Sequence, residues 1–556
     1  VDYGRVSSGS NLPQLGPETA AIVLPRGLEI PLEAESAVVD WLLEHKERGF
    51  KVLVFGGIPF ADETQRKRFI EGLGMSGTGD IILPVTQLRE VEHDAEILQG
   101  AEKEARILSA DFVDLRAPSD ARVIRGVAGS RPGGGEVRMD AQFAASWGAV
   151  ALDPYLIFQR PDFREFWHFD IFAFLETVLG RVDAPLPDST TRYGRRMLLS
   201  HIDGDGFING SETAPGKFSA EVVRDEILKV YPIPVTVSVI EAEVTARVVT
   251  VDRALRPKFE AIARDIFELP NVQVASHSFS HPFMWMVGDR TAYLYDRTRL
   301  DLIDPYPQMD LAREIDDSVH YINEQLAPAG KEVEVFLWSG NCRPPPEALR
   351  RVNDLGLVAL NGGDTLISRR VPTINAVAPR SITWGDQLQV FAPAQNENVY
   401  TNDWEGPHFG TFLNVIDTFE RTESPRRLKP VNIYYHFYSG DYFSSLRALQ
   451  VIHDWAMKQP LHSITVRDYV HLAKDARAVE LFRQGDDRWA MVGRGDLQTY
   501  RIPRDWASRV DMAASDGLIG WKEFQEDLYL HTDGRSVVEF AKAPEGSDPE
   551  QIPRLE

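Results

Sequence analysis

The sequence predicts a mixed α/β protein with a central β/α barrel, an α/β domain before it and a small β-rich domain after it. Polar residues follow strand-length apolar runs in the middle of the chain, and strand-like and helix-like patterns alternate before them. Short apolar runs broken by Gly-Asp and Asp-Gly turns follow near the end. The chain of 556 residues is 43% apolar and 26% charged, a globular composition with room for about three to four domains.

The charge balance limits the partners of this chain. It carries 83 acidic against 60 basic residues, a net charge of −23, which repels phosphate backbones and excludes nucleic acid as an expected partner. A neutral or cationic substrate fits better, unless the acidity serves solubility alone. No apolar run approaches the roughly 18 residues of a membrane-spanning helix, so no membrane insertion is expected. No targeting peptide is visible after Val1.

Residues 1–185 are predicted to form an α/β sandwich of the Rossmann-like or flavodoxin-like type. Three apolar runs have the length of strands: 20–24, 51–55 and 148–152. Helices are expected between the first two runs and over Arg164–Leu179, and this alternation predicts a parallel sheet with helical cover. The glycines of Gly133-Gly134-Gly135 match no phosphate-loop spacing, so a surface loop and no nucleotide site are expected.

A change in composition marks the first expected domain boundary, and the start of the short apolar runs near the end of the chain marks the second. The segment 185–191 is rich in proline and small polar residues, which is typical of a linker. The barrel is therefore predicted over residues 192–475, and the β-rich domain over 480–556.

Five polar clusters within residues 192–475 each follow directly after a strand-like run. They are His201–Gly206, His277–His281, Ser339–Pro344, Asn361–Asp364 and His436. Catalytic groups at the carboxyl ends of strands, with helices returning between them, are the pattern of a β/α barrel. Two helices are visible: an apolar stripe runs from Leu311 to Leu326, and Pro345-Pro-Glu-Ala begins another.

His277 and His281 make the case for a metal site. Two imidazoles at i and i+4 can share one cation on a helical turn, although Pro282 disfavours helix at His281 and a turn is the alternative. Such a pair is often structural, and Asp203-Gly-Asp205 could be an Asx-type turn. Taken together, one carboxylate can ligate a cation while the other accepts a proton from water.

Four of these elements, in order, resemble the polysaccharide deacetylase motifs of family-4 carbohydrate esterases. They are Asp203 with Asp205, His277-Ser278-x-x-His281, Arg343-Pro344-Pro345, and His436 after an apolar strand. The resemblance implies a metal-dependent N-deacetylase on a deacetylase barrel. Gly204 separates the two aspartates that the family places side by side, and the family's fourth motif has only Asn361–Asp364 as a loose counterpart.

The resemblance also implies a role for each residue. The first carboxylate, Asp203, corresponds to the general base, and His436 to the general acid. Arg343 corresponds to the residue that orients the base. The metal ligands correspond to Asp205, His277 and His281, and the cofactor is expected to be a divalent metal, Zn²⁺.

Two segments point to a narrower group. His201–Phe207 and Ser276–Phe283 look like the deacetylase region of PelA-type proteins of Pel exopolysaccharide biosynthesis. This likeness implies deacetylation of an N-acetylgalactosamine-containing polymer in the periplasm, releasing acetate, with other biosynthesis or export proteins as partners. The alternatives are a noncatalytic carbohydrate-binding scaffold, a deacetylase of chitin or peptidoglycan, and a metal hydrolase of another substrate.

Five aromatic residues near these clusters could stack on sugar rings or pack in the core, and both interpretations stay open: Trp285, Trp338, Trp404, Tyr434 and Tyr435. The single cysteine, Cys342, excludes an internal disulfide framework and is expected to be a buried bystander.

Overall fold

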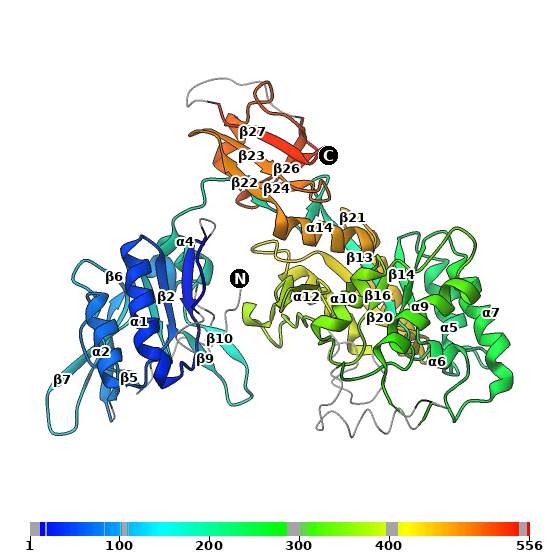
Figure 1. The fold of residues 1–556 in the computed structure, drawn as a ribbon, viewed down its shortest axis with the longest axis horizontal. Coiled ribbons are helices and arrows are strands. Elements are labelled where there is room, and N and C mark those ends of the chain that lie inside the picture. Colours follow the sequence, from blue (N-terminus) through cyan, green and yellow to red (C-terminus); the bar gives the residue numbers. More distant parts are fainter. Residues whose placement is uncertain are drawn as a thin grey trace. The chain divides into compact units, whose positions relative to one another are not determined.

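The structure is a computed structural model. It describes residues 12–16, 19–82, 84–100, 102, 108, 111–285, 302–303, 306, 308–395, 410–543 and 553–555. The chain divides into two compact units (Figure 1). The first is Val1–Asp183 with Val371–Asn375, and the second is Ala184–Arg370 with Ala376–Glu556. The boundary predicted between barrel and β-rich domain falls inside the second unit and stays a prediction.

The first unit contains a six-stranded sheet in the order β1-β2-β8-β7-β6-β4. The strands are β1 (Ala21–Leu24), β2 (Lys51–Gly56), β4 (Thr86–His93), β6 (Arg122–Ser130), β7 (Glu136–Ala145) and β8 (Gly148–Leu152). The three predicted strands, β1, β2 and β8, pair in parallel, but β4, β6 and β7 extend the sheet with antiparallel pairs.

The predicted parallel sheet is therefore confirmed for β1, β2 and β8, and it is wrong for the rest of the sheet, which is antiparallel. Strands β6, β7 and β8 are joined by connections too short for a crossover, and such connections make antiparallel pairs. The glycines Gly133-Gly134-Gly135 all have positive φ and form the turn between β6 and β7, where the Arg131 N–H donates to the Gly135 carbonyl at 3.0 Å.

The helices of the first unit are α1 (Leu32–Glu47), α2 (Glu63–Gly72), α3 (Ala95–Leu98) and α4 (Ile171–Leu179). The helix predicted over Arg164–Leu179 begins only at Ile171, because the Asp170 carboxylate caps it by accepting the N–H groups of residues 172 and 173. The residues before the cap form β10 (Glu165–Trp167), which pairs with β9 (Ile157–Gln159). Two shorter strands, β3 (Ile81–Ile82) and β5 (Phe112–Val113), pair with each other.

The second unit is built on an eight-stranded sheet. Its strands are β12 (Thr191–Arg192), β13 (Arg195–Asp203), β14 (Val235–Val239), β15 (Val272–Ser276), β16 (Val335–Leu337), β17 (Val358–Leu360), β20 (Val431–His436) and β21 (Leu461–Ser463). Parallel pairs join β20, β13, β14, β15, β16 and β17 in that order. Within the described ranges β17 and β20 do not pair, so the predicted barrel is present as an open, curled half-barrel.

Helices return between these strands, as predicted. They are α5 (Ser219–Val223), α6 (Glu241–Val244), α7 (Arg256–Phe267), α9 (Ser318–Tyr321), α10 (Pro346–Asp354), α12 (Val415–Arg421), α13 (Phe443–Met457) and α14 (Val466–Ala478). The apolar stripe from Leu311 to Leu326 is buried on one helical stretch, in which π-helical turns flank α9. The proline-initiated helix is α10. Strand β14, with the sequence Val-Thr-Val-Ser-Val, was not predicted; all five of its residues are buried, as in other parallel strands.

The end of the chain is rich in strands. One sheet contains β22 (Glu480–Arg483), β23 (Arg488–Val492) and β27 (Val537–Ala541), and another contains β11 (Leu186–Pro187), β24 (Thr499–Pro503), β25 (Leu518–Phe524) and β26 (Asp527–Thr532). Strand β11 comes from the predicted linker, which ties this segment to the start of the half-barrel. No helix in the described part of the chain is long and apolar enough to cross a membrane.

Candidate metal centre

The polar clusters that follow the strands meet at one edge of the half-barrel. Asp203 ends β13 and His436 ends β20, and the register of these two strands places them opposite each other. His277 directly follows β15, and Asn361 directly follows β17. Because neighbouring parallel strands end at the same edge, residues more than 230 positions apart, such as Asp203 and His436, are brought into one site.

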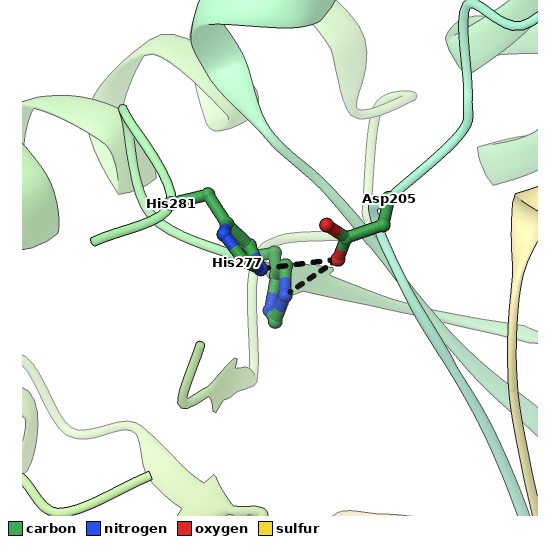
Figure 2. A group of neighbouring side chains, drawn as sticks. All are labelled: Asp205, His277 and His281. Atoms are coloured by element: carbon green, nitrogen blue, oxygen red, sulfur yellow. Dashed lines mark ion pairs between the residues drawn. The ribbon is translucent and has the colours of Figure 1, made fainter. Parts of the chain in front are cut away.

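Asp205, His277 and His281 form the closest group at this edge (Figure 2). Their potential ligand atoms all lie within 4.8 Å of one another. The Asp205 Oδ2 atom is 3.1 Å from Nε2 of His281 and 3.3 Å from Nε2 of His277. One carboxylate oxygen and two imidazole nitrogens that converge in this way are a typical ligand set for a divalent cation such as Zn²⁺.

The hydrogen bonding of the buried His277 fits a metal ligand. Its Nδ1 lies 3.0 Å from the carbonyl oxygen of Leu337, to which only an N–H can donate, so Nε2 is left to offer a lone pair to the site. Apart from the ion-pair contacts just given, Nε2 of His277 and Oδ2 of Asp205 are buried and have no hydrogen-bond partner in the described part of the structure. A bound cation would be coordinated by these two atoms.

The charges of the site favour an ionised Asp205. Burial alone would raise the pKa of its carboxyl, but His281 and His277 beside it, when protonated, lower this pKa well below its ordinary value. A carboxylate that stays ionised inside the protein is ready to ligate a cation.

The segment His277–His281 forms a turn rather than a helix, as the following Pro282 suggested. Ser278 and His281 both have positive φ, 69° and 60°. The His281 N–H donates to Oγ of Ser278 at 2.9 Å and closes the turn. The two imidazole rings thereby come within 4.9 Å, centroid to centroid.

Glu314 supports this turn through hydrogen bonds. Its carboxylate accepts the N–H groups of Phe279 at 3.1 Å and Ser280 at 2.9 Å, and the Ser280 hydroxyl also donates to it. Glu314 is fully buried, and burial raises the pKa of its carboxyl. The only signal for this residue in the sequence is its place next to Ile315 on the buried stripe, and no role was predicted for it.

Asp205 stands between two glycines, at points where the backbone passes close to its neighbours. A Cβ atom at Gly204 would lie 2.7 Å from the backbone nitrogen of Ile240, where the ends of β13 and β14 come together. Gly206 has a φ of 79°, and a Cβ there would lie 2.6 Å from the backbone nitrogen of Tyr438. The backbone can pass between its neighbours at these points only as glycine.

Asp203 lies beside the group of Asp205, His277 and His281. Both of its carboxylate oxygens accept from Nδ2 of Asn361 at 3.0 Å, and Oδ2 also accepts from the hydroxyl of Tyr434 at 3.1 Å. Its Oδ2 is 3.8 Å from Nε2 of His277, further than that of Asp205. This position is consistent with Asp205 as ligand and Asp203 as base, and both roles stay predictions.

His436 lies close to both aspartates of the site. Its Nε2 is 3.1 Å from the hydroxyl of Tyr434 and 3.8 and 3.9 Å from Oδ2 of Asp203 and Asp205. Its ring stacks on that of Tyr438, with centroids 4.5 Å apart and 12° between the planes. The predicted acid is therefore close to both carboxylates.

Arg343 does not reach Asp203 in this structure. It is exposed, and its side chain forms no hydrogen bond or ion pair with the residues that the structure describes. The preceding residue, Cys342, has a φ of 51°, so the chain turns directly before Arg343. Asn361 and Tyr434 make the contacts that the resemblance predicted for this arginine.

The aromatic residues divide between core and site. Trp285 and Trp338 are fully buried and pack edge to face at 4.9 Å, and Tyr435 is fully buried as well, so the core interpretation holds for all three. Tyr434 points its hydroxyl into the site. Trp404 lies outside the described residues. Cys342 is buried, and its thiol donates to the Trp338 carbonyl at 3.2 Å, as expected of a bystander.

No protein-family model and no curated protein matches this sequence. Solved structures similar to part of it include the Bc1960 peptidoglycan N-acetylglucosamine deacetylase (12% identity, 51% of this chain, 89% of that chain, TM-score 0.26). Two others are peptidoglycan deacetylase PdaC from Bacillus subtilis (14%, 51%, 94%, 0.28) and 4-α-glucanotransferase from Thermococcus litoralis (12%, 49%, 37%, 0.29). This chain thus spans about a third of the glucanotransferase. All three TM-scores are below 0.5.

Proposed function

We propose that this chain is a metal-dependent N-deacetylase of an N-acetylated polysaccharide, with Zn²⁺ held by Asp205, His277 and His281. The observation that carries the proposal is the meeting of this ligand set with a second carboxylate, Asp203, and a third imidazole, His436, at one sheet edge. Hydrolysis of an amide by this route needs a cation site, a base and an acid.

Each residue has one task in the proposed reaction. When bound, the cation supplies Lewis-acid activation of water and of the amide carbonyl. Asp203 accepts the proton of the attacking water on a carboxylate oxygen, and His436 donates a proton to the nitrogen of the departing amine. The C–N bond breaks, and the products are acetate and a free amino sugar.

The hydrogen bonds around Tyr434 support this division of tasks. An ionised Asp203 can only accept, so the hydroxyl of Tyr434 donates its proton to Oδ2 of Asp203. The phenol oxygen is then the acceptor for Nε2 of His436, 3.1 Å away, which must carry a proton. The Nε2 proton of His436 thereby lies on the nitrogen that is 3.8 and 3.9 Å from the two carboxylates, and the ring acts as an acid once Nδ1 carries a proton as well.

The narrower substrate follows from sequence resemblance alone. We propose a polymer that contains N-acetylgalactosamine, of the Pel type, deacetylated in the periplasm beside other exopolysaccharide biosynthesis or export proteins. The net charge of −23 fits a product that becomes cationic as acetyl groups are removed.

Release of acetate from N-acetylated galactosamine and glucosamine oligomers tests the proposal, with Asp203→Asn as the matched variant. We expect release by the unaltered protein and a loss of about 10²–10⁴-fold in Asp203→Asn, with metal still bound. Binding of the oligomers without any acetate release would favour a carbohydrate-binding scaffold. Loss of metal from Asp203→Asn would mean that the two aspartates have exchanged roles.

A further inference from the structure

Three buried polar side chains form a hydrogen-bonded row that ends at Asp203. His201 precedes it by two residues on β13, Asn432 lies on the adjacent strand β20, and Asn361 follows β17. All three are 0% exposed. A buried polar group lowers the stability of the fold unless it is hydrogen-bonded, so each group in the row is expected to have a partner. The donor and the acceptor of each hydrogen bond can then be assigned.

The direction of the Asn361 amide is set by its neighbours. Its Nδ2 lies 3.0 Å from both oxygens of Asp203 and 2.9 Å from the carbonyl oxygen of Trp338, which are all acceptors. The amide nitrogen must therefore face Asp203, and Oδ1 must face His201. Oδ1 lies 3.0 Å from Nε2 of His201, so that nitrogen carries a proton and donates.

The other nitrogen of His201 completes the row. Burial lowers the pKa of His201, so the ring is neutral and its Nδ1 is an acceptor. The amide of Asn432 lies 3.1 Å from Nδ1 with its oxygen toward the ring, while its Nδ2 has no partner among the described groups. Amide oxygen and nitrogen have nearly the same shape, and turning this amide gives Nδ1 a donor.

We propose that His201 and Asn361 are positioning residues that fix the carboxylate of Asp203 as the base. Each hydrogen bond then donates toward it: from His201 to Asn361, from Asn361 to both oxygens and, with the Asn432 amide turned as described, from Asn432 to His201. The inference rests on the proposed function and names the groups that hold its base in place of Arg343. Asn361 has a φ of 93°, a costly conformation for a residue with a side chain, which directs its amide to this place.

A pair of substitutions at one position separates this role from simple packing. His201→Gln keeps a donor that can reach Oδ1 of Asn361, and His201→Leu does not. We expect kcat for acetate release to fall by about 10–100-fold in His201→Leu and in Asn361→Ala, with KM within about threefold and metal content unchanged. His201→Gln is expected to recover most of the loss.

Equal kcat values for the Leu and Gln variants, or an unchanged kcat in Asn361→Ala, would overturn the inference. So would loss of metal from both His201 variants, because it would place this residue with the ligands. Acetate release by the unaltered protein is measured first. Its absence would refute the proposed function, whereas active protein with indifferent variants would refute only the positioning role.

The proton on His201 gives a readout that does not depend on activity. Nitrogen-15 spectra of histidine-labelled, zinc-loaded protein, with the signal assigned by its loss in His201→Gln, report which nitrogen is protonated. We expect a neutral ring with its proton on Nε2 at neutral pH. A proton on Nδ1 alone, or a charged ring, would contradict the direction of the row.

Discussion

The two ends of strand β13 carry charged groups of different kinds. At the amino end, the buried Arg196 donates to the carbonyl oxygens of Lys429 and Phe419 and to the hydroxyl of Thr422, and it pairs with Glu423 at 3.2 Å. At the carboxyl end, the carboxylates of β13 and the residues after it face imidazoles.

The basic side chains at the two ends differ in whether they can lose a proton near neutral pH. Burial lowers the pKa of Arg196 only to about 10, so this guanidinium stays charged at neutral pH and its bonds are structural. Imidazoles can lose their protons near neutrality and present lone pairs to a cation. A cavity of about 420 Å³ lies at the amino end, beside Trp455 and Phe524, yet the potential metal ligands are at the other end.

The largest effect is expected from His277→Ala at the carboxyl end. The variant loses one of three ligands, so bound metal falls to background and acetate release falls by about 10³-fold or more. Metal analysis of the purified variant and the unaltered protein checks this. Equal metal content in the two would remove the assignment of the site.

Arg196→Met, at the amino end, is expected to affect stability instead of chemistry. It leaves three buried acceptors without their donor, and the free energy of unfolding should fall by about 3 kcal/mol. Denaturant unfolding measures the loss, and metal content is the control. If this variant lost metal while keeping its stability, the proposed difference between the two ends of β13 would fail.

Glu314→Ala should weaken the metal site without removing a ligand. The turn that carries His277 and His281 loses three hydrogen bonds, and the affinity for Zn²⁺ is expected to fall by about 10–100-fold. Competition with a chelator measures the affinity, and Glu314→Gln, which keeps an acceptor, should lie closer to the unaltered protein. Equal affinities in all three proteins would show that Glu314 does not support the site.

The smallest effect is expected from Arg343→Ala. Because this side chain is exposed and does not reach Asp203, kcat should change by less than about threefold. Steady-state rates of acetate release by this variant and by the unaltered protein measure the change in kcat. A loss similar to that of Asn361→Ala would restore Arg343 as the residue that orients the base.

The sequence predicted what depends on local pattern. Polar residues directly after apolar runs indicated the strand ends, and the proline after His281 indicated a turn. The partners of Asp203 could not be predicted, because Asn361 and Tyr434 reach it through strand pairing across more than 150 residues. The mixed sheet of the first unit was missed for a different reason: β6 and β7 were not predicted as strands, and the short turn at Gly133–Gly135 makes them antiparallel.

The central claim is that acetate release requires a metal ion bound by Asp205, His277 and His281. Zn²⁺ titrated into chelator-stripped protein, with bound metal and acetate release from N-acetylated oligomers followed together, tests it most directly. The account predicts no release before zinc is added, a rate that rises with bound zinc, and saturation at about one ion per chain. Full acetate release by the stripped protein, or saturation of His277→Ala at the same zinc concentration, would contradict it.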